Sequence, residues 1–341
     1  MTSKIYKFSS ALIGAGRIGF QHEYDEKRIK PASHYGMLIG NKKINFKAIC
    51  DKNPKNLELI KKNNKNINLY ESYKEMIIKE KPDIVSIATW RDTHYEIMDY
   101  CSDNGVKAII CEKPISENLK DAKKIVSKLK NLNIPLFINH RRRFDSELIK
   151  LKTNNITHYV GEILQVNCFY VYGLLTTGTH LIDTLIYLLE KTEGEIKSVL
   201  GFGNTSNSFC PTDDPNIDFI LFFSSGLKVF VQSLDMKSYD IFEFNFFGKK
   251  GKLSLKNIGR DIEQFNIIKS PEHKGFTELN SNPKKKLGGI PRNQFGTLIN
   301  NVIETLNGKS ISYSNGDDSI KVMKIIEAIK LSTLKNKKIN L

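Results

Sequence analysis

Short apolar runs alternate with amphipathic stretches through the first 140 residues. The runs have strand length and are rich in β-branched residues, whereas the stretches between them place apolar residues at helical spacing. This alternation predicts a parallel sheet covered by helices on both faces. The predicted strands are Ser10–Ile13, Ile44–Cys50, Ile67–Tyr70, Asp83–Ala88, Lys107–Cys111 and Pro135–Asn139, and the predicted helices are Asn56–Lys62, Ser72–Lys79, His94–Asn104 and Leu119–Leu129.

The pattern changes after Asn139. A basic turn, His140–Arg143, leads into a helical stretch, and strands joined by glycine-containing turns dominate from Glu162 onward, which indicates antiparallel pairing. We therefore predict an α/β domain at residues 1–140 and an α+β domain with a mainly antiparallel sheet at residues 141–341. In the second domain the predicted strands are Ile163–Tyr172, Ser198–Gly203, Asp218–Phe223, Lys228–Asp235, Ile241–Phe247 and Leu253–Leu255, and the predicted helices are Thr179–Leu189, Asn293–Leu306 and Asp318–Leu334.

A glycine-rich turn follows the first predicted strand directly. Residues Gly14–Gly19 (GAGRIG) fit the pattern GxGxxG, which in this context predicts a dinucleotide pyrophosphate at the N-terminus of the next helix. We expect Gly14 to allow the tight turn and Gly16 to let backbone N–H groups approach the pyrophosphate. Gly19 is expected to let the helix pack close to the sheet.

Asp51 ends the second predicted strand, where a carboxylate accepts hydrogen bonds from an adenosine ribose. It lies 37 residues after Gly14, against about 20 expected, and we assign the excess to an insertion at Gln21–His34. The other role open to Asp51 is a helix cap before Asn53. An aspartate favours NAD over NADP, while the adjacent Lys52 leaves NADP possible.

Polar residues also follow the fourth and fifth predicted strands, at the edge where a doubly wound sheet binds its ligand. Lys113, within Glu112–Pro114 (EKP), could polarise a carbonyl there or act on a substrate hydroxyl. Thr89 and Trp90 follow the fourth strand, and His94 comes next. A solvated loop position for Lys113 and a helix N-terminal position for His94 are equally open.

Taken together, these motifs resemble the Gfo/Idh/MocA oxidoreductases, the family of glucose–fructose oxidoreductase and inositol dehydrogenase. The resemblance runs nearly end to end, and EKP followed by the GxHxxD pattern is specific. The residues that carry it are the GAGRIG turn, Asp51, His94, Glu112–Pro114, Arg143–Asp145, Gly161–Ile163, Gly178–Asp183 and the terminal segment from Asp318 through Ile326-Glu327-Ala328 to Ser332.

The resemblance implies an N-terminal Rossmann domain that binds NAD, with NADP possible, and hydride transfer to or from a ring carbon of a sugar or cyclitol. It places Lys113 beside the nicotinamide and the substrate oxygen and makes His180 the acid/base, a role that suits a near-neutral imidazole. The implied cofactor-binding residues are Gly14, Gly16, Arg17, Ile18, Gly19, Asp51, Thr89, Trp90, His94, Glu112 and Lys113, and the expected substrate-binding residues are Arg143, Thr176, Thr179 and Asp183.

Two departures from the family pattern point to a branch. Many members carry an aspartate where this chain has Thr176, and Asp183, one helical turn beyond His180, is a possible substitute with a structural hydrogen bond as its other role. The segment from Ile163 to His180 is also shorter than in many relatives. Both features resemble the branch that acts in nucleotide-sugar and surface-glycan synthesis.

Two other functions remain open. A non-catalytic sensor would keep the fold and use the dinucleotide for regulation, which Thr176 permits. A redox-assisted lyase or glycosidase would keep NAD tightly bound and recycle it. The presence of both Lys113 and His180 favours an enzyme.

Composition changes the picture in two respects. The net charge is +15, but 44 of the 52 basic residues are scattered lysines, which is a compositional bias rather than a nucleic-acid-binding patch. The charge favours an anionic sugar, which Arg143 could bind bidentately while Arg141 and Arg142 are solvated. Five cysteines without a CxxC pair predict no disulfide framework and no metal, and with no membrane span they favour a cytoplasmic location. The family resemblance implies a homodimer or homotetramer.

Overall fold

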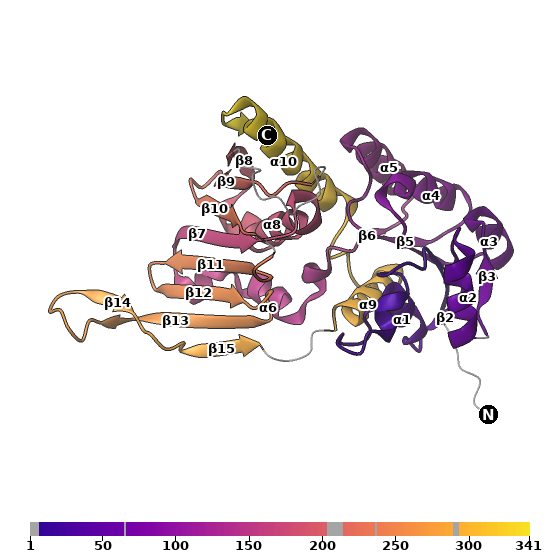
Figure 1. Cartoon of the computed structure of the whole chain (residues 1–341), viewed down its shortest axis with the longest axis horizontal. Helices are drawn as coiled ribbons and strands as arrows, with labels where there is room; N and C mark the ends of the chain where they lie inside the picture. Colours follow the sequence, from indigo (N-terminus) through magenta and orange to yellow (C-terminus); the bar gives the residue numbers. More distant parts are fainter. Residues whose placement is uncertain (1–6, 65, 203–213, 236, 289–292) are drawn as a thin grey trace. The chain divides into compact units, whose positions relative to one another are not determined.

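The computed structural model describes residues 7–64, 66–202, 214–235, 237–288 and 293–341. The chain forms two compact units, one of Met1–Ser146 with Pro291–Lys321 and the other of Glu147–Ile290 with Val322–Leu341 (Figure 1). The sequence pattern predicted one division near residue 140. It did not anticipate that the chain returns to the first unit after completing most of the second.

A parallel sheet with the strand order β3-β2-β1-β4-β5-β6 forms the centre of the first unit. The order reverses between β1 and β4, which is the switch point at which doubly wound sheets bind ligands. The predicted parallel sheet is confirmed. Its strands are β1 (Phe8–Ile13), β2 (Ile44–Cys50), β3 (Asn68–Tyr70), β4 (Ile84–Ile87), β5 (Ala108–Cys111) and β6 (Leu136–Ile138).

Helices cover both faces of this sheet, so every residue of β4 and β5 is buried. Short polar side chains begin several of the helices, such as Asn53 before α2 and Ser72 before α3, by accepting a hydrogen bond from a first-turn N–H. The helices are α1 (His34–Ile39), α2 (Pro54–Asn63), α3 (Tyr73–Glu80), α4 (Arg91–Asp103), α5 (Leu119–Asn131) and α9 (Gln294–Leu306), and η2 (Arg141–Phe144) is a short 3-10 turn.

The helix expected directly after the glycine turn is interrupted. The backbone N–H of His34 donates to the oxygen of Ile18, and that of Tyr35 donates to Gly19. An α-helix joins residues four apart in this way; here sixteen positions separate the partners, so twelve residues are looped out. The 3-10 turn η1 (Gln21–Tyr24) begins this loop. The insertion predicted from the late position of Asp51 therefore lies inside the first helix.

The second unit contains a mixed sheet in the order β14-β13-β12-β11-β7-β10-β9-β8-β16, with β15 also on β13. Its described strands pair antiparallel, apart from β7 with β10. This confirms the α+β class. The strands are β7 (Ile163–Tyr170), β8 (Ile196–Phe202), β9 (Asp218–Phe223), β10 (Lys228–Ser233), β11 (Phe242–Gly248), β12 (Gly251–Lys256), β13 (Asp261–Lys269), β14 (Thr277–Leu279), β15 (Lys285–Gly288) and β16 (Ile339–Asn340).

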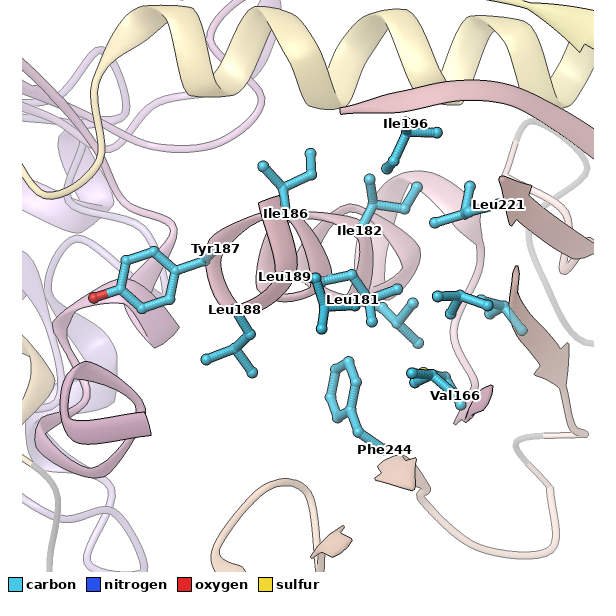
Figure 2. Close-up of a cluster of buried hydrophobic side chains, with 14 of the residues drawn as sticks. Val166, Leu181, Ile182, Ile186, Tyr187, Leu188, Leu189, Ile196, Leu221 and Phe244 are labelled. Atoms are coloured by element: carbon cyan, nitrogen blue, oxygen red, sulfur yellow. The ribbon is translucent and has the colours of Figure 1, made fainter. Parts of the chain in front are cut away.

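One face of this sheet packs on α8 (Thr179–Glu193). Leu181, Ile182 and Leu189 of the helix lie against buried strand side chains such as Val166 and Phe244 (Figure 2). The strand β13 was not predicted because it has little apolar alternation, with Ile262 its one fully buried residue. The remaining elements are α6 (Ser146–Asn154), α7 (Ile156–Val160), the π-helical turn η3 (Leu174–Gly178) and α10 (Gly316–Lys335), which begins in the first unit and ends in the second.

Within the described ranges, no helix is long and apolar enough to cross a membrane. The same residues contain no cluster of three His, Cys, Asp or Glu side chains arranged to hold a metal ion. Cys50, Cys101, Cys111 and Cys168 are buried thiols, and burial raises the pKa of Cys50 to about 12. Cys210 lies outside the described residues.

Candidate active site

The glycine turn has one position open to a ligand and two closed to any side chain. Gly14 has φ +93°, and a Cβ there would lie 2.6 Å from the carbonyl of Ala88 at the end of β4. At Gly19 a Cβ would collide with the backbone oxygen of Gly14. The third glycine thus permits close packing of the turn on itself, rather than of a helix on the sheet as we expected. No heavy atom lies within 4 Å of a Cβ placed at Gly16.

Asp51 binds the glycine turn to the end of β2. Its Oδ2 accepts from the backbone N–H of Ala15 at 2.7 Å and from Asn56 Nδ2 at 3.0 Å, and its Oδ1 accepts from the N–H of Asn53 at 2.8 Å. A carboxylate offers about four acceptor positions, and these three bonds leave capacity on Oδ1 for a ribose hydroxyl. The N-cap of α2 is Asn53, whose own side chain accepts from the N–H of Lys55. The helix-cap role left open for Asp51 therefore belongs to Asn53.

A hydrogen-bonded chain of polar side chains ends at Glu112, the first residue of the EKP segment. The imidazole of His34 bonds Ser86 Oγ at 2.7 Å and Glu112 Oε1 at 2.8 Å, and Asn139 Nδ2 donates to the same Glu112 oxygen at 2.6 Å. Burial tends to raise the pKa of Glu112, but the bonds from His34 and Asn139 and the charge of Lys113 lower it to about 2. Glu112 therefore stays ionised beside Lys113 over the whole physiological pH range.

His94 connects the ends of two neighbouring strands. Its ring is buried, with Nδ1 2.8 Å from the carbonyl oxygen of Pro114 and Nε2 3.1 Å from that of Thr89. Burial lowers the pKa of this imidazole. Because both ring nitrogens face protein carbonyls, His94 positions the β4 and β5 ends, which differs from the direct cofactor contact we expected. Trp90, the residue after Thr89, is 82% exposed.

Arg143, which was expected to bind an anionic substrate, is buried and paired with another residue of the chain. The Arg143 guanidinium is buried, with Nη1 2.8 Å from Asp318 Oδ2 and 3.3 Å from the carbonyl oxygen of Tyr313. The ion pair neutralises its charge, which corrects the substrate-binding role. Arg141, expected to be solvated, is half-buried, and burial lowers its pKa while the charge of Glu112 opposes that effect.

In the second unit, the predicted residues gather where η3 meets α8. His180 is half-buried in the first turn of α8, and Asp183 is buried one turn further on. Thr176 is exposed. The Thr179 hydroxyl donates to the carbonyl oxygen of Leu175 at 2.6 Å, so this side chain stabilises the helix start. That bond differs from the substrate contact expected for Thr179.

Sequence reasoning missed one residue at this location. The buried carboxylate of Asp214, in the turn before β9, accepts a hydrogen bond from the Thr176 hydroxyl at 2.7 Å. Thirty-eight positions separate the two residues. The local sequence Asp214-Pro215-Asn216 is typical of any turn, so no signal connected it to position 176.

The comparison with known families decides the assignment. The Gfo/Idh/MocA oxidoreductase family with an NAD-binding Rossmann fold matches residues 8–140, and the C-terminal alpha/beta domain of that family matches residues 173–341. The chain belongs to the Gfo/Idh/MocA oxidoreductase family. The resemblance inferred from the motifs is thereby confirmed, as is NAD as the cofactor of the first domain.

Individual relatives are more distant. A myo-inositol 2-dehydrogenase of Thermotoga maritima is 31% identical over 141 residues, which is 41% of this chain and 38% of that protein. A D-apiose dehydrogenase of Rhizobium rhizogenes is 27% identical over 46% of this chain and 41% of its own length. This chain thus spans less than half of these curated relatives.

Among solved structures, the fold is similar to that of the WlbA dehydrogenase from Bordetella pertussis in complex with NADH and UDP-GlcNAcA. The TM-score is 0.77 at 18% identity, covering 98% of this chain and 99% of the other. At this identity the likeness establishes the fold alone.

Proposed function

We propose that this Gfo/Idh/MocA oxidoreductase is an NAD-dependent sugar dehydrogenase or reductase. The observation that carries the proposal is the open space at Gly16, where a ligand could approach the backbone. On either side of it, Gly14 and Gly19 are packed so closely that neither position accepts a side chain. Backbone N–H groups in such a turn bind a pyrophosphate. Asp51, with acceptor capacity remaining on Oδ1, would bind the adenosine ribose. When bound, NAD⁺ would accept a hydride from the substrate carbon on oxidation, and NADH would supply one on reduction.

Two reacting side chains carry this proposal, Lys113 and His180. Lys113 follows β5 at the ligand edge of the first sheet, where its ammonium would bind and polarise the substrate oxygen. His180 would accept the hydroxyl proton on oxidation and return it on reduction. His94 and the His34–Glu112 pair would hold the strand ends that carry Lys113 and Trp90.

For the substrate, we favour a nucleotide-linked or otherwise anionic sugar. The net charge of +15 raises the local concentration of anions around the protein. The similar WlbA structure was determined with a UDP-sugar acid, whereas the two curated relatives are named for myo-inositol and D-apiose. Activity on a UDP-uronic acid but not on myo-inositol would support this choice, and the reverse preference would contradict it.

We also propose that the protein self-associates through its second unit. Along the strands of this unit, several positions that alternate with the buried core are half-buried aromatic residues, namely Phe222, Phe230, Phe247 and Phe265. A face of this kind is typical of an interface. Light scattering should give a dimer or tetramer, and a monomer at micromolar concentration would contradict the proposal.

The central test compares two lysines near opposite ends of β5. Lys113→Met should lower turnover of the best sugar by about 10³-fold while NADH binding is unchanged. Lys107→Met, just before β5 begins, is the matched control and should retain both. Retained turnover in Lys113→Met would remove Lys113 from the mechanism. Product formation without net change in NADH would instead favour the redox-assisted lyase.

A further inference from the structure

The start of the helix that carries His180 is capped by a distant segment. The first N–H groups of a helix have no partner within it and need acceptors from elsewhere. Here residues 214–216 supply acceptors for four successive N–H groups. Asn216 Oδ1 accepts from Gly173 at 2.8 Å, the Pro215 oxygen accepts from Leu174 at 3.1 Å, and the Asp214 carboxylate accepts from Leu175 at 2.6 Å and from Thr176 at 2.9 Å.

The carboxylate of Asp214 fits closely against this helix start. Gly173 has φ +82°, and a Cβ on it would collide with the Asp214 carboxylate. Asp214 is 6% exposed, and its third bond is from the Thr176 hydroxyl at 2.7 Å. A buried carboxylate that accepts three hydrogen bonds at a helix N-terminus is strongly held, because hydrogen bonds to an ionised acceptor are stronger than those between neutral groups.

The capped turn has a π-helical bonding pattern. The N–H of Gly178 donates to Gly173 and that of Thr179 to Leu174, so the bonds of η3 join residues five apart. Such a π-turn contains one residue more than an α-helical turn, which shifts the residues that follow by about 100° around the axis. The capped residues Gly173–Thr176 end four positions before His180, about one helical turn, so a change in the cap would rotate or loosen that imidazole.

We propose that Asp214 is a positioning residue for His180. Its hydrogen bonds hold the π-turn in place. Through the Thr176 hydroxyl, it also supplies a carboxylate near the position at which many family members have an aspartate and this chain has Thr176. The inference rests on the proposed role of His180 as the acid/base. A hydroxyl that donates its proton to a carboxylate acts as an acceptor toward another partner, so Thr176 would accept from a donor group of the sugar.

The experiment compares three variants of the 341-residue chain, and a fourth, His180→Gln, serves only to identify the His180 resonance. Asp214→Asn keeps the size of the side chain but replaces one carboxylate oxygen by an NH₂ group. This donor would face the N–H groups of Leu175 and Thr176, which need an acceptor. Thr176→Val removes the hydroxyl and keeps the backbone bonds. Asp218→Asn is the matched control, because Asp218 Oδ1 accepts from the N–H and the hydroxyl of Ser233, both at 2.7 Å, within the same sheet.

Two readouts separate this inference from the proposed function. The first is the Cε1–H resonance of His180 in the protein without substrate, identified by its loss in His180→Gln. Asp214→Asn should move its chemical shift and its titration midpoint, and Thr176→Val should move them in the same direction, while Asp218→Asn should not. An unchanged resonance in Asp214→Asn would overturn the inference, whether or not a substrate has been found.

The second readout is turnover. Asp214→Asn should lower kcat by about 10²-fold, as expected when a reacting group is displaced, and should shift the pH profile of kcat. NADH binding should be unchanged, because it depends on the first unit. A loss no larger than in Asp218→Asn would contradict the positioning role. If the unmodified protein does not bind NADH, that result would instead contradict the proposed function.

Discussion

The two units differ in how their functional residues are brought together. In the first unit, Asp51, Thr89 and Glu112 all follow parallel strands, and the pairing of β2, β1, β4 and β5 places those strand ends at one edge. In the second unit, the partner of Thr176 is Asp214, from a turn between antiparallel strands. A parallel sheet therefore makes the neighbours of a residue predictable from strand order, whereas an antiparallel sheet with long connections does not.

The largest effect expected within the first unit tests whether the glycine turn is rigid. Gly19→Ala should destabilise the protein by more than about 4 kcal/mol, because its Cβ would meet the Gly14 backbone. Gly16→Ala should leave stability unchanged and impair NADH binding. Urea unfolding and NADH titration of both variants give the answer. Equal stability of the two would show that the turn is adaptable.

Arg143 was expected from the local sequence to bind an anionic substrate, but in the structure it pairs with Asp318. Arg143→Met leaves the half-buried Asp318 without its cation, so we expect a loss of about 3 kcal/mol in the free energy of unfolding. The KM for an anionic sugar should not change. A raised KM with normal stability would restore the substrate role that the sequence first indicated.

The His34–Glu112 pair should make stability depend on pH. Because folding lowers the pKa of Glu112 from near 4.5 to about 2, its stabilisation is present above pH 4.5 and is lost as the pH falls toward 2. Between pH 5 and pH 3, the free energy of unfolding of Glu112→Gln should therefore fall by about 2 kcal/mol less than that of the unmodified protein. Urea unfolding at pH 5 and pH 3 measures this. Glu75→Gln, at an exposed ion pair with Lys79, is the control, and an equal effect there would contradict the account.

The smallest effect concerns Asp51. Asp51→Ala should weaken NADH binding by about tenfold, or roughly 1.4 kcal/mol, and weaken NADPH binding less. Asn56→Ala removes one bond to the same carboxylate and keeps its charge, so it should change neither affinity by more than about twofold. Equal losses for both nucleotides in Asp51→Ala would mean that this carboxylate only shapes the turn.

The sequence predicted the fold class, the parallel sheet, most strands of the second sheet and the glycine turn after β1, because strand–helix periodicity and glycine spacing are local signals. It did not predict that α1 resumes after a loop and brings His34 to Glu112, because looped-out residues hide the continuity of a helix. The ion pair of Arg143 with Asp318 was missed for a related reason. Its partner comes from the segment 291–321, which returns to the first unit from far along the chain.

The most direct measurement uses Trp90, the single tryptophan of the chain, which is 82% exposed at the end of β4. NADH added to nucleotide-free protein should quench the Trp90 fluorescence and produce sensitised nicotinamide emission. Gly16→Ala, with unchanged urea unfolding, should lose both signals. If the unmodified protein gives neither signal, or Gly16→Ala responds as strongly, the claim that the glycine turn binds the dinucleotide is contradicted.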